Sequence, residues 1–375
     1  MTQKKKLLIF HPYLAPYRID LYNALAKVFD VMVLLTGGKK ELATLGYDLQ
    51  AVNRQADFSY QYYSKGFYVG RHLISSIYYK VIKKFKPDIL LAHELGFNTL
   101  FAILLKSIFR YKIFVTIDDS LKMSLNYSKL REYLRKFVIT HTDGLIVVHP
   151  EIKIFLTQKY GIKGCKYHYL PIIQNEKTLE NKFCDALPQS QDILEKYNFS
   201  GKKVILFIGR LIKNKNPELL LDVFAELYKN NTDLRLVFIG DGVLKNILKD
   251  IVISNHLADA VYFTGRLTGA DLYAWYNIGQ IFVLPSLHEP FGAVINEALV
   301  AGCKVIVSDS VGASCLINEN NGIIFKTNDY HSLESALSQT ITNISPLRAL
   351  CVRSSNMSES FSVHVNQFTE FVCLS

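Results

Sequence analysis

Short apolar runs rich in β-branched residues recur along this 375-residue chain and alternate with stretches of helical period. One series of runs occupies the N-terminal half, and a second begins at Val204. Strand–helix–strand alternation of this kind predicts parallel sheets that helices cover on both faces. The predicted strands of the first series are 7–10, 31–36, 89–92, 113–117 and 145–148. Those of the second series are 204–208, 234–239, 261–263, 281–284 and 305–307.

The two series predict two doubly wound α/β domains of similar size in tandem. Residues 174–203 lose the alternation and become polar, so we place the domain junction there. We expect an N-terminal domain over residues 1–180 and a C-terminal domain over residues 181–359, with a deep cleft between them. Helical periods between the strands are clearest at 18–28 and 98–109.

Composition excludes a disordered chain and argues against a membrane-spanning one. Hydrophobic residues make up 49% of the sequence and aromatic residues 12%, which is enough to bury a core. No apolar run approaches the roughly 18–20 residues that a spanning helix needs. Only four apolar residues follow Lys4–Lys6, too few for a secretory signal. The six cysteines lie far apart without a C-x-x-C pair, so we expect reduced thiols in a cytoplasmic protein, without disulfides or a zinc site.

The net charge of +10 is concentrated in the N-terminal half. Residues 1–180 hold 27 Lys and Arg against 14 Asp and Glu, whereas residues 181–375 hold 16 against 19. A basic half-chain indicates an anionic partner. The densest part is 58–86, where interleaved tyrosines and lysines suit the headgroup region of an anionic membrane. The alternative is an amphipathic helix with solvated lysines. Its core-facing residues would be Leu73, Ile74, Ile77, Val81 and Phe85.

The residues that follow each strand indicate a site, because ligands of open parallel sheets bind beyond the carboxyl ends of the strands. In the second series these residues include Gly209, Gly240 and Gly265. Glycine lets backbone N–H groups approach a ligand closely. Arg210 and Lys215, five positions apart on one loop, have the charge and reach to clamp two phosphates without a metal.

A pair of carboxylates follows the fourth strand of the second series. Glu289 precedes a predicted helix, and Glu297 lies on that helix. The free N–H groups and the positive dipole end of the helix would face the same edge of the sheet. Carboxylates are poor phosphate ligands but good acceptors for sugar hydroxyls. Phosphate donors, a cationic clamp and two hydroxyl acceptors together predict a nucleotide-sugar site.

These segments resemble the family 4 glycosyltransferases of GT-B fold in order and spacing, including the paired-glutamate motif of that family. They are FIGRLIKNKNPELLLDVFAEL (207–227), FIGDG (238–242), VYFTGR (261–266) and PSLHEPFGAVINEALVAGCKVIVSD (285–309). The resemblance implies two Rossmann-like domains and a retaining transfer from a nucleoside-diphosphate sugar, with no metal and no other cofactor. It also implies that a helix near 360–375 packs back on the N-terminal domain.

The resemblance further implies a role for each charged residue of the donor site. Arg210 and Lys215 would bind the diphosphate. Glu297 would bind the ribose, and Glu289 would bind the donor sugar.

Backbone groups and the base have implied places as well. Phe291 and Gly292 would donate N–H groups near the diphosphate, and residues 265–267 would border the base. The full predicted donor set is Arg210, Lys215, Gly240, Gly265, Arg266, Leu267, Glu289, Phe291, Gly292, Ala293 and Glu297.

The N-terminal half departs from the family pattern at two strand ends. Many relatives have a glycine pair after the first strand, whereas this chain has HPYLAPYRIDLYNAL (11–25), which resembles a subgroup with a Pro-Tyr-Arg loop. Many relatives have a histidine after the fourth strand, where this chain has Asp118. We interpret Asp118 as a supporting residue and His93 as lining the acceptor side. The predicted acceptor-side set is His11, Tyr17, Arg18, His93 and Asp118, and the predicted catalytic set is Glu289, Asp118, Arg210 and Lys215.

The resemblance implies a hexosyltransferase-type enzyme, and the basic N-terminal half suggests that it works at the inner face of the cell membrane. It would move a hexose or N-acetylhexosamine from a nucleoside-diphosphate sugar, UDP in preference to GDP, to a lipid-linked glycan in capsule, O-antigen or exopolysaccharide biosynthesis. A nucleotide-sugar epimerase of the same fold is the alternative, and it would turn over the donor alone. We expect no nucleic-acid partner, because the chain has no recognisable binding module. The first strand leads into His11-Pro12-Tyr13 rather than a G-x-G-x-x-G turn, which disfavours a dinucleotide-dependent oxidoreductase.

Overall fold

The computed structural model describes residues 3–36, 54–63, 65–69, 72–118, 128–161 and 164–375. The chain divides into two compact units. Unit 1 comprises Met1–Gln174 and Phe361–Ser375, and unit 2 comprises Asn175–Ser360. No helix within the described ranges is long and apolar enough to cross a membrane.

Unit 1 is built on a seven-stranded parallel sheet with the strand order β3-β2-β1-β6-β7-β8-β9, and β4 and β5 form a separate antiparallel pair. Its strands are β1 (Lys6–His11), β2 (Asp30–Leu35), β3 (Ser59–Tyr62), β4 (Phe67–Val69), β5 (His72–Ile74), β6 (Ile89–His93), β7 (Lys112–Ile117), β8 (Gly144–Val147) and β9 (Tyr167–Tyr169). Its helices are α1 (Pro16–Val28), α4 (Ile77–Phe85), α5 (Phe97–Phe109), α7 (Lys129–His141), α8 (Pro150–Tyr160) and α16 (Phe361–Leu374).

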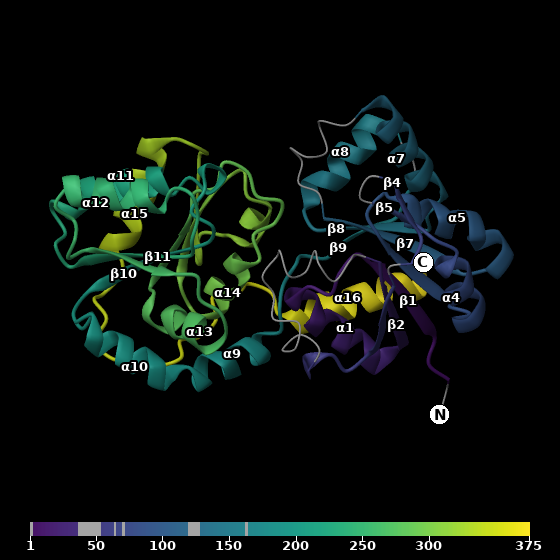
Figure 1. Ribbon diagram of the computed structural model, residues 1–375, viewed down its shortest axis with the longest axis horizontal. Coiled ribbons are helices and arrows are strands. Elements are labelled where there is room, and N and C mark those ends of the chain that lie inside the picture. The colour runs from purple at the N-terminus through teal and green to yellow at the C-terminus, as the bar shows by residue number, and fades with distance from the viewer. Residues whose placement is uncertain (1–2, 37–53, 64, 70–71, 119–127, 162–163) are drawn as a thin grey trace. The chain divides into compact units, whose positions relative to one another are not determined.

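Helices cover both faces of this sheet (Figure 1). Alternate strand residues point to opposite faces. Ile113 and Val115 of β7 belong to one core cluster together with buried residues of α4, α5, α7 and α8. Phe114 points to the other face, where its ring lies 5.5 Å from that of Phe371 on α16. Gly144 also belongs to that face, since a Cβ there would lie 2.8 Å from the Phe371 ring.

Unit 2 has a six-stranded parallel sheet of order β12-β11-β10-β13-β14-β15. Its strands are β10 (Lys203–Ile208), β11 (Leu234–Ile239), β12 (Val261–Gly265), β13 (Ile281–Leu284), β14 (Lys304–Ser308) and β15 (Gly322–Phe325). Its α-helices are α9 (Glu176–Asp185), α10 (Leu187–Lys196), α11 (Pro217–Tyr228), α12 (Lys245–Ser254), α13 (Gly269–Ile278), α14 (Val294–Val300) and α15 (Tyr330–Thr342), and its 3₁₀ turns are η1 (Lys213–Lys215) and η2 (Gly312–Leu316).

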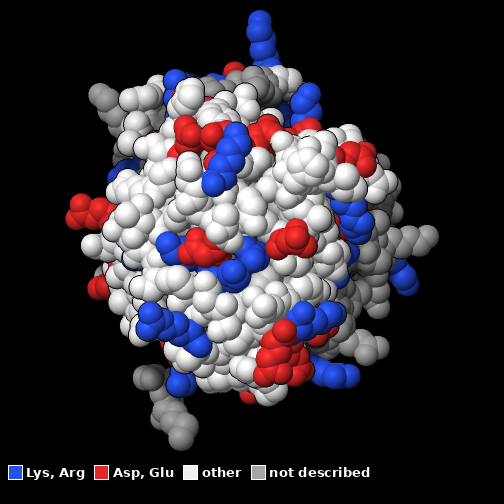
Figure 2. Space-filling model, turned by 90° about the vertical axis from the view of Figure 1, so that its left-hand side faces the viewer, with Lys and Arg blue, Asp and Glu red and all other residues white. Residues whose placement is uncertain are grey.

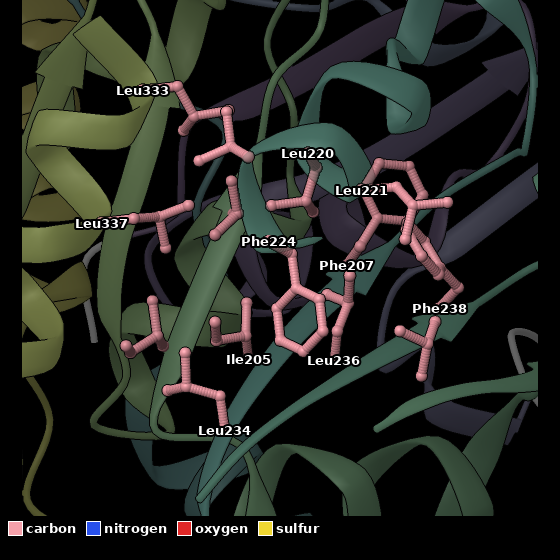
Figure 3. Close-up of a cluster of buried hydrophobic side chains, with 14 of the residues drawn as sticks. Ile205, Phe207, Leu220, Leu221, Phe224, Leu234, Leu236, Phe238, Leu333 and Leu337 are labelled. Atoms are coloured by element: carbon pink, nitrogen blue, oxygen red, sulfur yellow. The ribbon is translucent and has the colours of Figure 1, made fainter. Parts of the chain in front are cut away.

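The core of unit 2 forms because β10 and β11 are apolar along almost their whole length and are buried on both faces. In Figure 1, α11, α12 and α15 lie on one side of these strands, and α9, α10 and α13 lie on the other. Side chains of β10, β11, α11 and α15 converge on the first side (Figure 3). They include Ile205, Phe207, Leu220, Leu221, Phe224, Leu234, Leu236, Phe238, Leu333 and Leu337. This core fixes the β10 and β11 ends that carry the candidate site.

The predicted fold class and all ten predicted strands are confirmed. Five strands, β3, β4, β5, β9 and β15, were not predicted. The segment 174–203, where we placed the domain junction, contains two helices that the sequence analysis did not predict, α9 and α10. Asn175 caps α9 by accepting a hydrogen bond from the N–H of Thr178, and Leu179 and Phe183 are buried.

The basic segment 58–86 is not one amphipathic helix. It forms β3, β4, β5 and only then α4, so Ile74 lies on a strand. Tyr78, one of the tyrosines of this segment, lies on α4 and is only 3% exposed, so it packs into the core. Residues 64 and 70–71 lie outside the described part of the chain, as do the side chains of 68–73.

Candidate functional site

Three strand ends of unit 2 meet in one layer of glycine backbone. The N–H of Gly240, after β11, donates to the carbonyl of Gly265 at the end of β12, with N···O 2.8 Å. Gly240 has φ +146°, and a Cβ there would lie 1.9 Å from the carbonyl oxygen of Gly209, which follows β10. Only glycine fits such a close approach. The layer therefore presents backbone, without side chains, at the carboxyl edge of the sheet.

A buried ion pair joins the loops after β10 and β13. The N–H of Leu287 donates to the carbonyl of Asn214 (2.8 Å), and Asn214 Nδ2 donates to the carbonyl of His288 (2.7 Å). These two bonds hold η1 against the loop that precedes α14. Lys215 Nζ contacts Glu289 Oε2, with side chains only 14% and 17% exposed. The pair predicted from the sequence as diphosphate and sugar ligands is thus in direct contact.

The surroundings of Lys215 shift the pKa of its ammonium group. Burial and the positive charge of Arg210 lower the pKa of Lys215 to about 8. Arg210 itself is exposed. Two cations at one strand end, one buried and one reaching into solvent, make an arrangement suited to a polyanion.

Glu297 is oriented by a buried tyrosine. Tyr276 on α13 donates its hydroxyl to Glu297 Oε2 at 2.8 Å. Burial, and then the charge of Glu297, hold the pKa of Tyr276 well above its usual value. Tyr276 is therefore a neutral, fixed hydrogen-bond donor. Its hydrogen bond fixes the orientation of the Glu297 carboxylate.

The turn before α14 is held by backbone bonds to the loop after β14. The N–H of Gly312 donates to the carbonyl of Glu289 (3.0 Å), and the N–H of Ala313 donates to that of Phe291 (2.7 Å). Gly292 has φ +94°, a conformation that favours glycine. Ala293 follows at the start of α14. These bonds give the segment around Glu289 a defined backbone.

The remaining predicted donor residues follow β12. Gly265 has φ +77°, Arg266 is exposed and Leu267 is half-buried. They lead from the glycine layer into α13. All eleven residues of the predicted donor set therefore lie at the carboxyl edge of the unit 2 sheet or on the turns and helix that follow its strands.

Unit 1 carries a second cluster at the ends of three neighbouring strands, β1, β6 and β7. The rings of His11 and His93 lie 4.1 Å apart. Asp118 Oδ2 lies 4.0 Å from His93 Nδ1 and accepts a hydrogen bond of 2.5 Å from Arg18 Nη2. Tyr17 is half-buried, with its ring centroid 5.9 Å from the Arg18 guanidinium carbon. The structure thus brings the predicted acceptor-side residues together.

The protonation states in this cluster follow from its charges. Burial disfavours the Asp118 carboxylate, but Arg18 and His93 outweigh this and lower its pKa to about 2. Burial, with His93 and Arg18 nearby, lowers the pKa of His11 well below its usual value, so His11 is neutral at pH 7. Because Asp118 is paired with Arg18 and is a very weak base, it is suited to positioning rather than to accepting a proton.

The cluster is a poor cation site. Among the described residues, His11, His93 and Asp118 offer ligand atoms within 4.8 Å of one another, close enough for a metal ion. The Arg18 guanidinium, however, already neutralises the carboxylate that such an ion would need.

Comparison with known proteins decides the family. The family model described as glycosyl transferases group 1 matches residues 189–354, and the model described as Glycosyltransferase Family 4 matches residues 17–172. The UDP-Gal:alpha-D-GlcNAc-diphosphoundecaprenol alpha-1,3-galactosyltransferase of Escherichia coli is 30% identical over 274 residues, which are 69% of this chain and 67% of that relative. The chain belongs to the family 4 glycosyltransferases.

Other relatives of this family 4 glycosyltransferase match only in part. Mannosylfructose-phosphate synthase of Agrobacterium fabrum is 27% identical over 200 residues, 51% of this chain. The chain spans only 42% of the length of that synthase and 50% of that of alpha-D-kanosaminyltransferase of Streptomyces kanamyceticus. Among solved structures, the Anabaena protein HepE in complex with UDP superposes with a TM-score of 0.73 at 15% identity, covering 99% of this chain and 100% of that one. These superpositions show the GT-B fold.

Sequence reasoning missed several residues that contact the predicted site residues. Tyr276 lies inside a helix, where no strand-end or spacing signal marks it. Thr116 contacts His93 Nδ1 through its hydroxyl at 3.1 Å, and the N–H of Asp118 donates to Glu94 Oε1 at 2.8 Å. Glu94 stands directly after His93 at a strand end, so its position was the one available signal.

We expect replacement of Tyr276 by phenylalanine to lower the free energy of unfolding by about 1–2 kcal/mol, because the half-buried Glu297 loses a hydrogen bond. Urea unfolding measures this change. Tyr262→Phe is the matched control, since the Tyr262 hydroxyl donates to the carbonyl of Asp259 at an exposed position. Equal unfolding midpoints for the two variants would show that the Tyr276–Glu297 bond contributes nothing.

Proposed function

We propose that this glycosyltransferase is a retaining enzyme that transfers a hexose or N-acetylhexosamine from a UDP-sugar to a lipid-linked glycan in surface polysaccharide biosynthesis. The observation that carries the proposal is the constellation at one sheet edge of unit 2. This edge carries a layer of glycine backbone. The same edge holds the Lys215–Glu289 pair, Arg210, and Glu297 with its hydrogen bond from Tyr276.

The constellation fits the chemistry of a nucleoside-diphosphate leaving group. As the bond between the sugar C1 and the diphosphate oxygen breaks, negative charge develops on the diphosphate. Arg210 and Lys215 would neutralise that charge. In other enzymes a metal ion can have this role, so we propose that transfer here needs no metal. Glu289 would accept hydrogen bonds from the donor sugar, and Glu297 would accept them from the ribose. The residues 265–267 would border the base.

Names of relatives support the choice of substrates. The Escherichia coli relative is named for a UDP-galactose donor and a diphosphoundecaprenol-linked acceptor. HepE was solved with UDP, and also with UDP and glucose. We therefore propose a UDP-sugar donor and an acceptor linked to a polyprenyl diphosphate. Such an acceptor is membrane-embedded, so the proposal includes peripheral association with the inner face of the cell membrane.

A thermal-shift screen against UDP-, GDP-, dTDP- and ADP-sugars, with and without EDTA, tests the donor site. We expect the UDP-sugars to raise the melting temperature, with no effect of EDTA and with loss of the shift in Glu297→Ala. Glu319→Ala, an exposed carboxylate of unit 2, is the matched control and should keep the shift. A shift that EDTA abolishes, or that Glu297→Ala retains, would contradict the proposed site.

Turnover with donor alone separates transfer from epimerisation. A transferase releases UDP stoichiometrically with product when a lipid-linked acceptor is present. Conversion of the UDP-sugar to its epimer without any acceptor would overturn the proposal in favour of the epimerase.

A further inference from the structure

Four helices of unit 1 share one outward surface. Helices α4, α5, α7 and α8 all pack on the same core cluster and so cover the same face of the sheet, with α5 in contact with both α4 and α7. We call their outward-facing surface the outer helix face. Large apolar side chains that stand exposed on it are Tyr79, Phe97, Leu104, Ile108, Leu130, Tyr133 and Ile154.

Helix α5 is apolar on its solvent side as well as on its core side. Phe97, Phe101, Leu104 and Ile108 follow one another at spacings of four, three and four residues, which places them on one stripe. Leu104 is 66% exposed and Ile108 is 67% exposed. The opposite side of the helix is buried in the core through Ala102, Ile103 and Leu105. Solvated helices normally turn polar residues outward, so a stripe of this kind marks an interaction surface.

The neighbouring helices also carry exposed apolar side chains. The ring of Tyr79 on α4 lies 5.6 Å from that of Phe109 on α5, and Lys83 Nζ lies 5.8 Å from the Tyr79 centroid. On α7, Leu130 and Tyr133 are 70% and 71% exposed and three residues apart. The apolar groups therefore spread over several helices.

The charges around these apolar groups are almost all positive. Segments 77–86, 97–110, 129–141 and 150–160, which hold the four helices and the C-caps of α4 and α5, contain twelve Lys and Arg but only two Asp and Glu. Helices α4 and α5 contain no acidic residue at all. The face of unit 2 in Figure 2, in contrast, carries basic and acidic side chains intermixed. Exposed apolar groups among lysines fit the boundary between anionic headgroups and acyl chains.

We propose that the outer helix face binds an anionic lipid bilayer. In this arrangement the α5 stripe and the α7 residues Leu130 and Tyr133 enter the acyl boundary, and the lysines of α4 meet the phosphates. The inference rests on the proposed function and adds to it the surface that meets the membrane. The sequence analysis assigned that role to segment 58–86, whereas the surface proposed here has its apolar part mainly on α5 and α7. The positive charge would also suit a nucleic acid. Binding of a nucleic acid, however, would not explain why the aliphatic side chains of Leu104 and Ile108 are exposed.

Sedimentation of the full-length protein with phosphatidylcholine vesicles, with and without phosphatidylglycerol, tests the proposal. Wild-type protein should bind only the vesicles that contain phosphatidylglycerol, and added salt should weaken binding. Leu104→Ser combined with Ile108→Ser should reduce the partition coefficient at least about tenfold. Lys83→Gln combined with Lys84→Gln should reduce it roughly tenfold.

Matched controls come from unit 2. Ile253 is as exposed as Ile108, at 67%, and Lys249 is exposed on the same helix, so Ile253→Ser and Lys249→Gln should bind vesicles as the wild type does. Circular dichroism checks that each variant is folded. Unchanged vesicle binding in the α5 double variant would overturn the proposal. A second result would also overturn the proposal: the wild type is a dimer that does not bind vesicles, and the α5 double variant is a monomer. The stripe would then be a protein interface.

The donor screen keeps this inference separate from the proposed function. Vesicle binding is measured without donor or acceptor, and the α5 variants leave every predicted donor residue intact. Loss of vesicle binding together with a retained UDP-sugar shift supports the membrane surface. Absence of any donor shift in the wild type, with vesicle binding that depends on Leu104 and Ile108, would reject the transferase and keep the surface.

Discussion

Replacement of Lys215 by methionine should lower kcat/KM for sugar transfer about 10²–10³-fold, the largest effect on activity that we expect from a single change. Lys215 is largely buried, lies against Glu289 and shares its strand end with Arg210. A buried cation stabilises charge that develops on a leaving diphosphate more strongly than an exposed one, because little water screens it. Methionine preserves the length and apolar character of the side chain and removes only the charge.

Lys213 provides the control for this variant. It lies on the same 3₁₀ turn, two residues before Lys215, and is exposed. Lys213→Met should therefore keep kcat/KM within about twofold of the wild type, since exposed charges interact weakly. Initial rates measured with a UDP-sugar and a lipid-linked acceptor decide the question. If Lys215→Met lost no more activity than Lys213→Met, Lys215 would not act on the diphosphate.

Replacement of Arg18 by methionine should lower the free energy of unfolding at pH 7 by about 3 kcal/mol, because it leaves the Asp118 carboxylate without its main counter-charge in a largely buried site. A further change of Asp118 to asparagine should recover part of this loss, since no uncompensated charge then remains. Urea unfolding of the single and double variants measures both effects. Lys159→Met, which breaks the half-exposed ion pair with Glu132, should cost less than about 1 kcal/mol.

At low pH the difference in unfolding free energy between the wild type and Arg18→Met should become smaller. The pKa of Asp118 in the folded protein, about 2, is lower than the ordinary value of 3.8 for this side chain. A lowered carboxyl pKa stabilises the fold above the unfolded pKa, and this contribution is lost as the pH falls towards the folded value. The difference in unfolding free energy should therefore be constant above about pH 5 and shrink from pH 4 towards pH 2. A gap that does not change with pH would exclude the ion pair as its cause.

Topology explains why so much of the site was predictable. Strand ends of a parallel sheet share an edge, so Arg18 and Asp118 were predicted on one side of one domain although a hundred residues separate them. The same rule placed Arg210, Lys215 and Glu289 together. It says nothing about side chains that reach the edge from inside a helix, which is why Tyr276 was missed.

Local polarity explains the misplaced elements. Edge strands such as β3 (Ser59–Tyr62) and β9 (Tyr167–Tyr169) are half-buried and carry few β-branched residues, so their pattern resembles that of a loop. Helices α9 and α10, within the predicted junction at 174–203, were not predicted because their exposed faces are rich in polar side chains. Their helical stability comes from a cap and from a few buried residues such as Phe183 and Leu194, which only tertiary packing reveals.

Unit 1 is made of two stretches of the chain that are far apart in the sequence, so one part of it is synthesised much later than the rest. Helix α16 packs on the face of the sheet that carries Phe114, yet it is synthesised after all of unit 2. During translation, unit 2 can complete its core while unit 1 still exposes the apolar surface that α16 will cover. Chaperones that recognise exposed apolar chain would meet unit 1 of the nascent chain at this stage, before the last helix emerges.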